Sequence, residues 1–169
     1  MLRWAIPGDS LQGDVLEIGC GNGNTGSEIL RESPTITLTA TDIDPLMVEE
    51  SRNNLPESVI VRQADATSLP FADGSFDVVV SPLMLHHVIE WELVVSEAFR
   101  VLRPGGKFIG YDLVDTVATS LLHRLDGSPY KLLSPLEFEA RSNQVGFQSV
   151  ETETATYGQT MRFRAIRPN

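Results

Sequence analysis

Apolar runs of strand length alternate with segments of helix length over the first two thirds of the chain. The apolar runs predict strands at residues 13–18, 36–41, 58–63, 76–81 and 106–112. The segments between them predict helices near residues 24–32, 45–54 and 90–102. This alternation is typical of an α/β fold in which a mostly parallel sheet carries helices on both faces.

Local signals mark the ends of these helices. The first helix is expected to be capped by Asn24 or Thr25, and Asp44 before Pro45 predicts an N-cap followed by proline at the first helical position. The third helix is expected to end at a stop signal that begins with Pro104.

The pattern changes after the fifth strand. Residues 113–133 lack a clean period, although 117–125 fit a short helix. Because this segment leaves the edge of the sheet where a ligand is expected, it is a candidate lid. The competing interpretation is an irregular connection packed permanently by its leucines.

A last helix and a hairpin complete the expected elements. Residues 134–137 have capping-box spacing with proline at the helix start, so a helix is expected from there to about Asn143. Residues 147–154 and 160–166 flank a short turn. The second of these runs alternates apolar side chains with arginines, which is typical of a half-exposed strand.

A glycine-rich turn follows the first predicted strand and is the most informative part of the chain. Gly19, Gly21 and Gly23 remove side chains, so the backbone can approach a ligand closely and adopt positive φ. From Gly21 onward the spacing satisfies G-x-G-x-x-G, which alone is a weak dinucleotide signal. Glu17, two residues before the first glycine, suits a cationic amino group better than a pyrophosphate. The turn therefore indicates a nucleoside cofactor with an ammonium or sulfonium group.

This turn resembles motif I of the class I S-adenosylmethionine-dependent methyltransferases, and further matches follow in the family's order. An acid closes the second strand about 20 residues on, as a ribose-binding acid does. The matching segments are Val15–Gly26, Asp42, Asp65-Ala66, Phe76–Ser81 and Glu97–Lys107. The resemblance implies a seven-stranded, mostly parallel sheet in the order 3-2-1-4-5-7-6, with the seventh strand antiparallel.

The resemblance also implies roles for individual residues toward S-adenosylmethionine. Glu17 is expected to bind the amino end, Asp42 the ribose hydroxyls, and Ile43 the face of the adenine. Asp65 and Ala66 are expected at the adenine edge, although an Asp in a loop also simply forms an Asx-turn. The expected cofactor-binding residues are Glu17, Gly19, Cys20, Gly21, Gly23, Asp42, Ile43, Asp65, Ala66 and Ser81.

The segment after the fourth strand is expected to bring the methyl group and its acceptor together. It contains one proline and no aromatic residue, which argues against a base-flipping enzyme. His87 resembles a histidine that serves as general base in some small-molecule members of the class, and otherwise packs beneath the lid. His86 is expected to point elsewhere. Tyr111 and Asp112 are second candidates for the acceptor pocket, and no metal-ligand spacing is recognised.

Composition narrows the choice of partner and compartment. The 169 residues fit one domain, and the net charge is -10 with lysine only at positions 107 and 131, so nucleic acid is not expected as a substrate. Cys20 is the single cysteine, which favours a reducing compartment. Neither a signal sequence nor a membrane span is expected, so the protein is placed in the cytoplasm, with homo-oligomerisation left open.

The sequence thus predicts a minimal methyltransferase that acts on a small-molecule acceptor and resembles the ubiquinone and menaquinone biosynthesis group. Only about twelve residues precede the first strand, where small-molecule members usually carry a helical cover. Two alternatives stay open. One is a catalytically inactive module that binds the cofactor or regulates a partner. The other is a nicotinamide-dependent oxidoreductase, which Glu17 disfavours.

Overall fold

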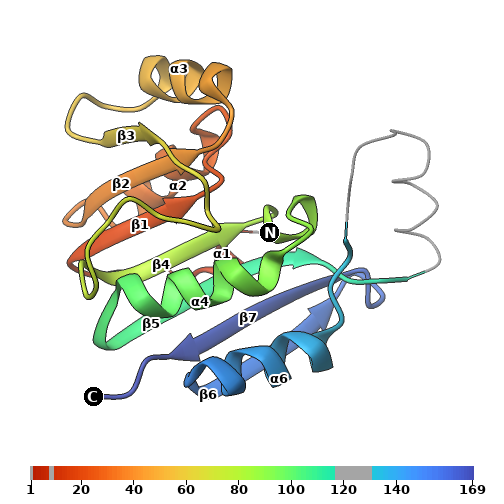
Figure 1. The fold of residues 1–169 in the computed structure, drawn as a ribbon. Coiled ribbons are helices and arrows are strands. Elements are labelled where there is room, and N and C mark those ends of the chain that lie inside the picture. Colours follow the sequence, from red (N-terminus) through yellow and green to blue (C-terminus); the bar gives the residue numbers. More distant parts are fainter. Residues whose placement is uncertain (1, 8–9, 117–130) are drawn as a thin grey trace.

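A seven-stranded sheet in the order β3-β2-β1-β4-β5-β7-β6 organises the molecule. The computed structural model describes residues 2–7, 10–116 and 131–169 (Figure 1). β3 and β6 form the two edges of the sheet, and β4 lies at its centre. The strands are β1 (Asp14–Ile18), β2 (Thr37–Asp42), β3 (Ile60–Gln63), β4 (Phe76–Pro82), β5 (Leu102–Leu113), β6 (Gln148–Ala155) and β7 (Thr160–Ile166).

The pairing confirms the expected strand order. β1 pairs in parallel with β2 on one side and with β4 on the other, and β4 pairs in parallel with β5. β7 runs antiparallel to both β5 and β6. β1 and β4 each contain a run of fully buried apolar residues, Val15–Leu16 and Val78–Val80, because helices cover both faces of the sheet.

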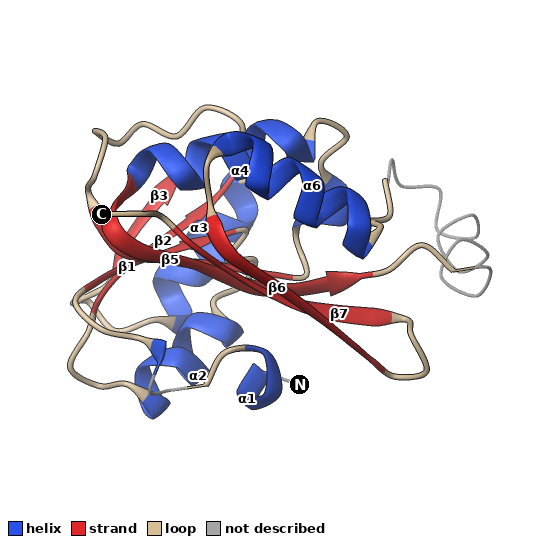
Figure 2. Ribbon diagram, turned by 90° about the horizontal axis from the view of Figure 1, so that it is seen from below, coloured by secondary structure: helices blue, strands red, loops and turns tan. Residues whose placement is uncertain are grey.

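The sheet separates the buried side chains into two core clusters, one on each of its faces. α4 and α6 cover one face, whereas α1 and α2 lie on the other (Figure 2). A ring cluster that includes Phe108, Phe138 and Phe163 fills the first core. The helices are α1 (Leu2–Ala5), α2 (Asn24–Glu32), α3 (Pro45–Asn54), α4 (Trp91–Val101) and α6 (Pro135–Val145), and a 3-10 turn, η2, spans Leu85–His87.

Two of the three expected helix N-caps lie where the sequence places them, and one of these two has its side-chain cap bond. The carboxylate of Asp44 accepts from Leu46 N at 2.9 Å and caps α3, as expected. α2 instead begins after Gly23, whose φ of 87° turns the chain directly into the helix, so Asn24 already lies inside it and the predicted cap was wrong. Ser134 stands at the N-cap of α6 without a side-chain cap bond.

β5 begins four residues earlier than the sequence predicts. The stop signal does end α4 at Val101, but the backbone then extends at once from Leu102 and pairs with Phe76 of β4. The register shifts before Lys107 because the chain between them takes up extra residues, with Gly105 at a φ of 75°. The stop signal that begins with Pro104 therefore lies within β5, where its residues form a bulge.

The C-terminal hairpin was predicted correctly. Glu151 lies opposite Arg164 and Glu153 opposite Arg162, so acidic and basic side chains face each other across β6 and β7. Most of the candidate lid, residues 117–130, lies outside the described residues. Its described end, Leu133, bridges Val114 in the first core.

Candidate functional site

A cavity of about 660 Å³ lies where the chain leaves the carboxyl ends of β1, β2, β3 and β4. Open α/β sheets bind their ligands at this edge, because loops from neighbouring parallel strands converge there. The cavity is lined by Gly19, Gly21, Thr41, Asp42, Ile43, Asp44, Met47, Ala64, Asp65, Ala66, Thr67, Leu83, Met84, His87, Val88, Ile89 and Glu90.

The glycine turn forms one wall of this cavity. The amides of Gly19 and Cys20 both donate to Thr41 O, at 2.8 and 2.9 Å, which ties the turn to the end of β2. Gly19 and Gly21 have φ values of 73° and 52°, so each adopts the left-handed conformation that glycine tolerates. A Cβ on Gly21 would meet nothing within 4 Å. The backbone at Gly21 is thus open to a ligand.

The carboxylate of Asp42 joins the turn to β2 and faces the cavity. Its Oδ2 accepts from Gly21 N at 2.9 Å, and its Oδ1 accepts from Asp44 N at 3.0 Å. An ionised carboxylate offers about four lone-pair sites. These two bonds therefore leave room for hydroxyl groups of a ligand.

Asp65 forms the Asx-turn that the sequence allows, and it also lines the cavity. Its Oδ1 accepts from Thr67 N at 2.8 Å and from Thr67 Oγ1 at 2.7 Å, which is an Asx-turn. Asp65 and Ala66 also line the cavity. The Asx-turn is therefore compatible with the position of Asp65 and Ala66 in the cavity wall.

Four expected cofactor residues do not line the cavity: Glu17, Cys20, Gly23 and Ser81. Cys20 is 4% exposed, and burial raises the pKa of its thiol to about 11. That raised pKa disfavours a thiolate nucleophile, and Cys20 packs in the second core as a small apolar side chain. Ser81 is fully buried in β4.

Glu17 lies behind the turn and faces α2. The side chain is fully buried, and a Cβ on Gly26 would lie 2.8 Å from its Oε2. Neither carboxylate oxygen has a hydrogen-bond partner within the described part of the chain. Burial, and secondarily the negative charge of Asp42, raise the pKa of Glu17 to about 8. Its contact with a cofactor stays a prediction.

The two adjacent histidines of η2 differ in exposure, although their rings lie against each other. His87 is exposed and lines the cavity, whereas His86 is only 4% exposed. His86 Nδ1 lies 2.5 Å from Asp112 Oδ1, and the two imidazole rings are 3.9 Å apart between centroids. The buried pair of His86 and Asp112 thus supports the turn that carries His87.

Asp112 anchors the segment after β4 and does not line the cavity, contrary to the sequence interpretation. Its Oδ2 accepts from Leu85 N at 2.7 Å, and its Oδ1 accepts from Leu113 N at the same distance. Tyr111 is also buried and packs in the other core.

Sequence reasoning missed the lining residues Met47 and Ile89. Met47 lies three residues after Asp44, on the first turn of α3, and this spacing was the only signal for it in the sequence.

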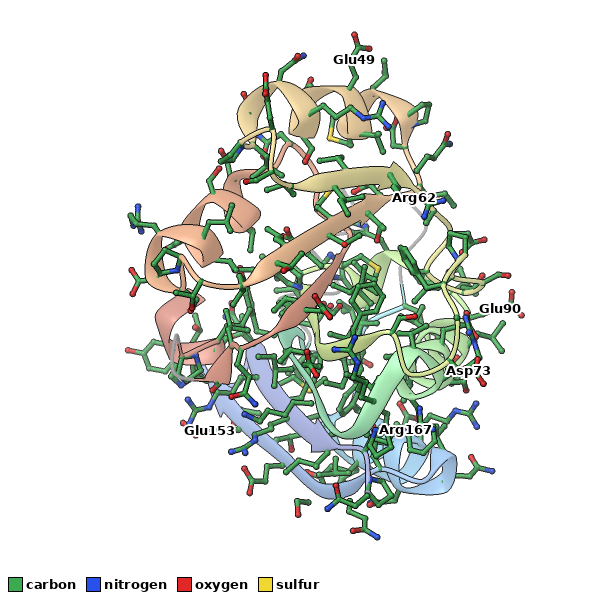
Figure 3. The ribbon with its side chains drawn as sticks, turned by 90° about the vertical axis from the view of Figure 1, so that its left-hand side faces the viewer. Glu49, Arg62, Asp73, Glu90, Glu153 and Arg167 are labelled. Atoms are coloured by element: carbon green, nitrogen blue, oxygen red, sulfur yellow. The ribbon has the colours of Figure 1, made fainter. Side chains whose placement is uncertain are left out.

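The carboxylates that line the cavity are not balanced by lysine or arginine in the described part of its wall. Asp42, Asp44, Asp65 and Glu90 line it, and Glu90 lies at the molecular surface (Figure 3). None of the lining residues that the structure describes is lysine or arginine. This charge suits a cationic ligand and opposes the pyrophosphate of a dinucleotide.

Two kinds of feature are absent from the part of the chain that the structure describes. Within residues 2–7, 10–116 and 131–169, no cluster of histidine, cysteine and carboxylate side chains is placed to hold a metal ion. In the same ranges, no helix has the length and apolar character needed to cross a membrane.

Comparison with known proteins agrees with this geometry. A demethylmenaquinone methyltransferase from Clavibacter sepedonicus is 30% identical over 182 aligned positions, which cover 91% of this chain and 73% of that protein. A ubiquinone/menaquinone biosynthesis C-methyltransferase from Desulfotalea psychrophila is 34% identical over 65% of this chain and 47% of its own length. The chain spans less than half the length of several such relatives.

Solved structures share the fold at low sequence identity. Phosphoethanolamine N-methyltransferase 2 of Haemonchus contortus, solved with S-adenosyl-L-methionine, superimposes with a TM-score of 0.82 at 18% identity. The match covers 99% of this chain and 51% of that one. The family model described as "Methyltransferase domain" matches residues 16–110, from β1 into β5. The chain therefore belongs to the methyltransferase domain family.

Proposed function

We propose that this protein binds S-adenosylmethionine and transfers its methyl group to a small-molecule acceptor. The observation that carries the proposal is the acidic cavity of about 660 Å³ at the carboxyl edge of the sheet, closed on one side by the glycine turn. The named relatives are methyltransferases of quinone biosynthesis, which supports a small acceptor. The reducing compartment that Cys20 indicates supports a cytoplasmic location.

The residues present fit this cofactor. Asp42 retains acceptor sites for the two ribose hydroxyls, and Ile43, 64% exposed in the cavity wall, offers an apolar surface to the adenine. Asp65 and Ala66 would meet the adenine edge. When bound, the cofactor supplies an electrophilic methyl group on a sulfonium. Glu17 would act on the cationic end through space, because its carboxyl group lies behind the turn.

The protein's own contribution is then to hold and orient the reactants and to exclude water from them. In-line methyl displacement disperses charge, so proximity and exclusion of water supply most of what a protein can add. A base is needed only when the acceptor must lose a proton. His87 is the lining residue best suited to that task, since its imidazole is exposed to the cavity and backed by the His86 ring.

Replacing Asp42 with alanine should weaken binding of S-adenosylhomocysteine about 10- to 100-fold, measured by calorimetry. This loss corresponds to about 1.4–2.7 kcal/mol, the size expected for lost hydrogen bonds to a charged group. Asp44→Asn is the matched control, because it keeps an acceptor for the α3 cap and should bind within about twofold of wild type. Equal losses in both variants, or no loss in Asp42→Ala, would contradict the ribose role.

Replacing His87 with alanine should lower turnover about 100-fold if the acceptor carries a dissociable proton. Turnover is measured as formation of S-adenosylhomocysteine with a panel that contains demethylmenaquinol, a catechol, a fatty acid and a primary amine. Binding of S-adenosylhomocysteine should change little. A turnover within a few-fold of wild type would assign His87 to packing.

The same panel separates an enzyme from an inactive cofactor-binding module. An enzyme forms product with at least one acceptor class, whereas an inactive module binds S-adenosylhomocysteine and forms none. Weak binding of NAD beside tight binding of S-adenosylhomocysteine would exclude the oxidoreductase alternative.

A further inference from the structure

Leu83 has a backbone conformation that leucine rarely adopts. It follows the last residue of β4 with a φ of 51°, in the left-handed region that a Cβ makes unfavourable. Its amide donates to Tyr111 O at 2.8 Å, so β5 fixes this conformation. Glycine or asparagine would satisfy the same backbone with less strain.

Core packing does not account for the leucine side chain. Leu83 is 38% exposed, whereas the apolar core side chains are at most 9% exposed. The described residues with positive φ that are neither glycine nor Leu83 are Ser149, Thr156 and Tyr157 in the C-terminal hairpin. Leu83 alone among these four lines the cavity. Strained residues that persist at a cavity point to a role there.

The segment after β4 contributes a group of apolar side chains to the cavity. Asp42 and Asp65 come from the ends of β2 and β3, where the cofactor is proposed to bind. Leu83, Val88 and Ile89 come from the segment after β4, together with His87 and Glu90, and Ile89 is 53% exposed. The proposed place of the cofactor at β2 and β3 leaves the segment after β4 for the second reactant.

We propose that Leu83 contacts the methyl acceptor and selects acceptors that present an apolar surface. The strained backbone fixes Leu83 in the wall of the cavity, which Ile89 also lines as a second apolar residue. This inference rests on the proposed function, since it assigns the second reactant of the same site. It adds the chemical class of the acceptor group and a residue that recognises it.

Leu83→Gly tests the inference, which predicts that this variant is more stable to heat than wild type but binds an apolar ligand more weakly. Relief of strain should raise the thermal midpoint, by about 2 °C for a chain of this size. The probe is N-phenyl-1-naphthylamine, a neutral aromatic dye whose fluorescence rises when it leaves water. Its affinity for protein saturated with S-adenosylhomocysteine should fall about tenfold or more in Leu83→Gly.

Two further variants make the result specific. Leu83→Met keeps an apolar side chain and should bind the dye within about threefold of wild type. Tyr157→Gly relieves the same strain at an exposed position outside the cavity, so it should raise the midpoint without changing dye binding. A loss of stability in Leu83→Gly, or unchanged dye binding, overturns the inference.

The measurements also separate this inference from the function beneath it. Wild-type protein that fails to bind S-adenosylhomocysteine contradicts the proposed function. Wild-type protein that binds S-adenosylhomocysteine but not the dye contradicts only the role of Leu83. Affinity for S-adenosylhomocysteine should stay within about twofold of wild type in all three variants.

Discussion

Replacing Glu17 with glutamine should abolish a loss of stability that the wild-type protein undergoes as the pH rises from about 5 to about 9. The wild-type side chain is fully buried, and its carboxylate oxygens have no hydrogen-bond partner among the described residues. Burial and the negative charge of Asp42 raise its pKa from 4.5 to about 8. Folding therefore favours the protonated form.

The sign follows from proton binding in the two states. Between pH 4.5 and about 8 the folded protein holds a proton on Glu17 that the unfolded chain has released. Stability therefore falls as the pH rises through this window and levels off above it. A difference of about 3.5 pKa units corresponds to about 4–5 kcal/mol in the free energy of unfolding.

Urea unfolding at a series of pH values measures this effect. The wild-type free energy of unfolding should fall by about 4 kcal/mol more than that of Glu17→Gln across the window. Glu49→Gln is the control, because Glu49 projects from α3 into solvent (Figure 3) and its replacement should leave the wild-type curve unchanged. Parallel curves for wild type and Glu17→Gln would refute the assignment.

The same group should couple to the cofactor. A cation bound in front of the glycine turn favours the ionised form of a carboxyl group behind it. Binding of S-adenosylmethionine near pH 7 should therefore release part of a proton from the wild-type protein. Calorimetry in buffers of different ionisation enthalpy detects this release, and Glu17→Gln should lack it.

The existence of the parallel strands was predictable because most of them carry their own signal. Runs such as Val78–Val80 are apolar throughout, as buried parallel strands require, and the glycine turn marks the first strand unambiguously. The resemblance then supplied the order, which periodicity alone does not contain. The strand ends were less accurate, because the extra residues before Lys107 are absorbed only when β4 pairs with β5.

Some residues of the cavity were predictable, because their position at the end of a parallel strand determines where they lie in the fold. Asp42, Ile43, Asp65 and Ala66 each follow a parallel strand, so topology alone brings them to one edge. The direction of Glu17 was not predictable, since it depends on how closely Gly26 brings α2 to the sheet.

The conformation of Leu83 and the use of Asp112 also lie beyond the sequence. Both follow from the spacing between the ends of β4 and β5, which local residue preferences do not encode. Leu83 N reaches Tyr111 O, and two residues later Leu85 N reaches the carboxylate of Asp112. A sequence shows the acid, but only the folded chain shows which donors it accepts.

Replacing Asp112 with alanine should lower the free energy of unfolding by about 3–5 kcal/mol. The carboxylate is fully buried and accepts from Leu85 N, from Leu113 N and from the ring of His86. Its removal leaves these donors without their acceptor, at a cost of about 1–3 kcal/mol for each buried group that stays unpaired. Denaturant unfolding measures the loss.

Asp112→Asn is the matched variant, because it keeps one oxygen of similar position. The asparagine oxygen can retain the bonds of Oδ1 to His86 and Leu113, whereas its NH₂ group faces Leu85 N, donor against donor. We therefore expect a loss between wild type and alanine. Because Leu85 begins the turn that carries His87 to the cavity, both variants should also reduce turnover by more than they weaken binding of S-adenosylhomocysteine. An alanine variant within about 1 kcal/mol of wild type would show that this carboxylate does not anchor the turn.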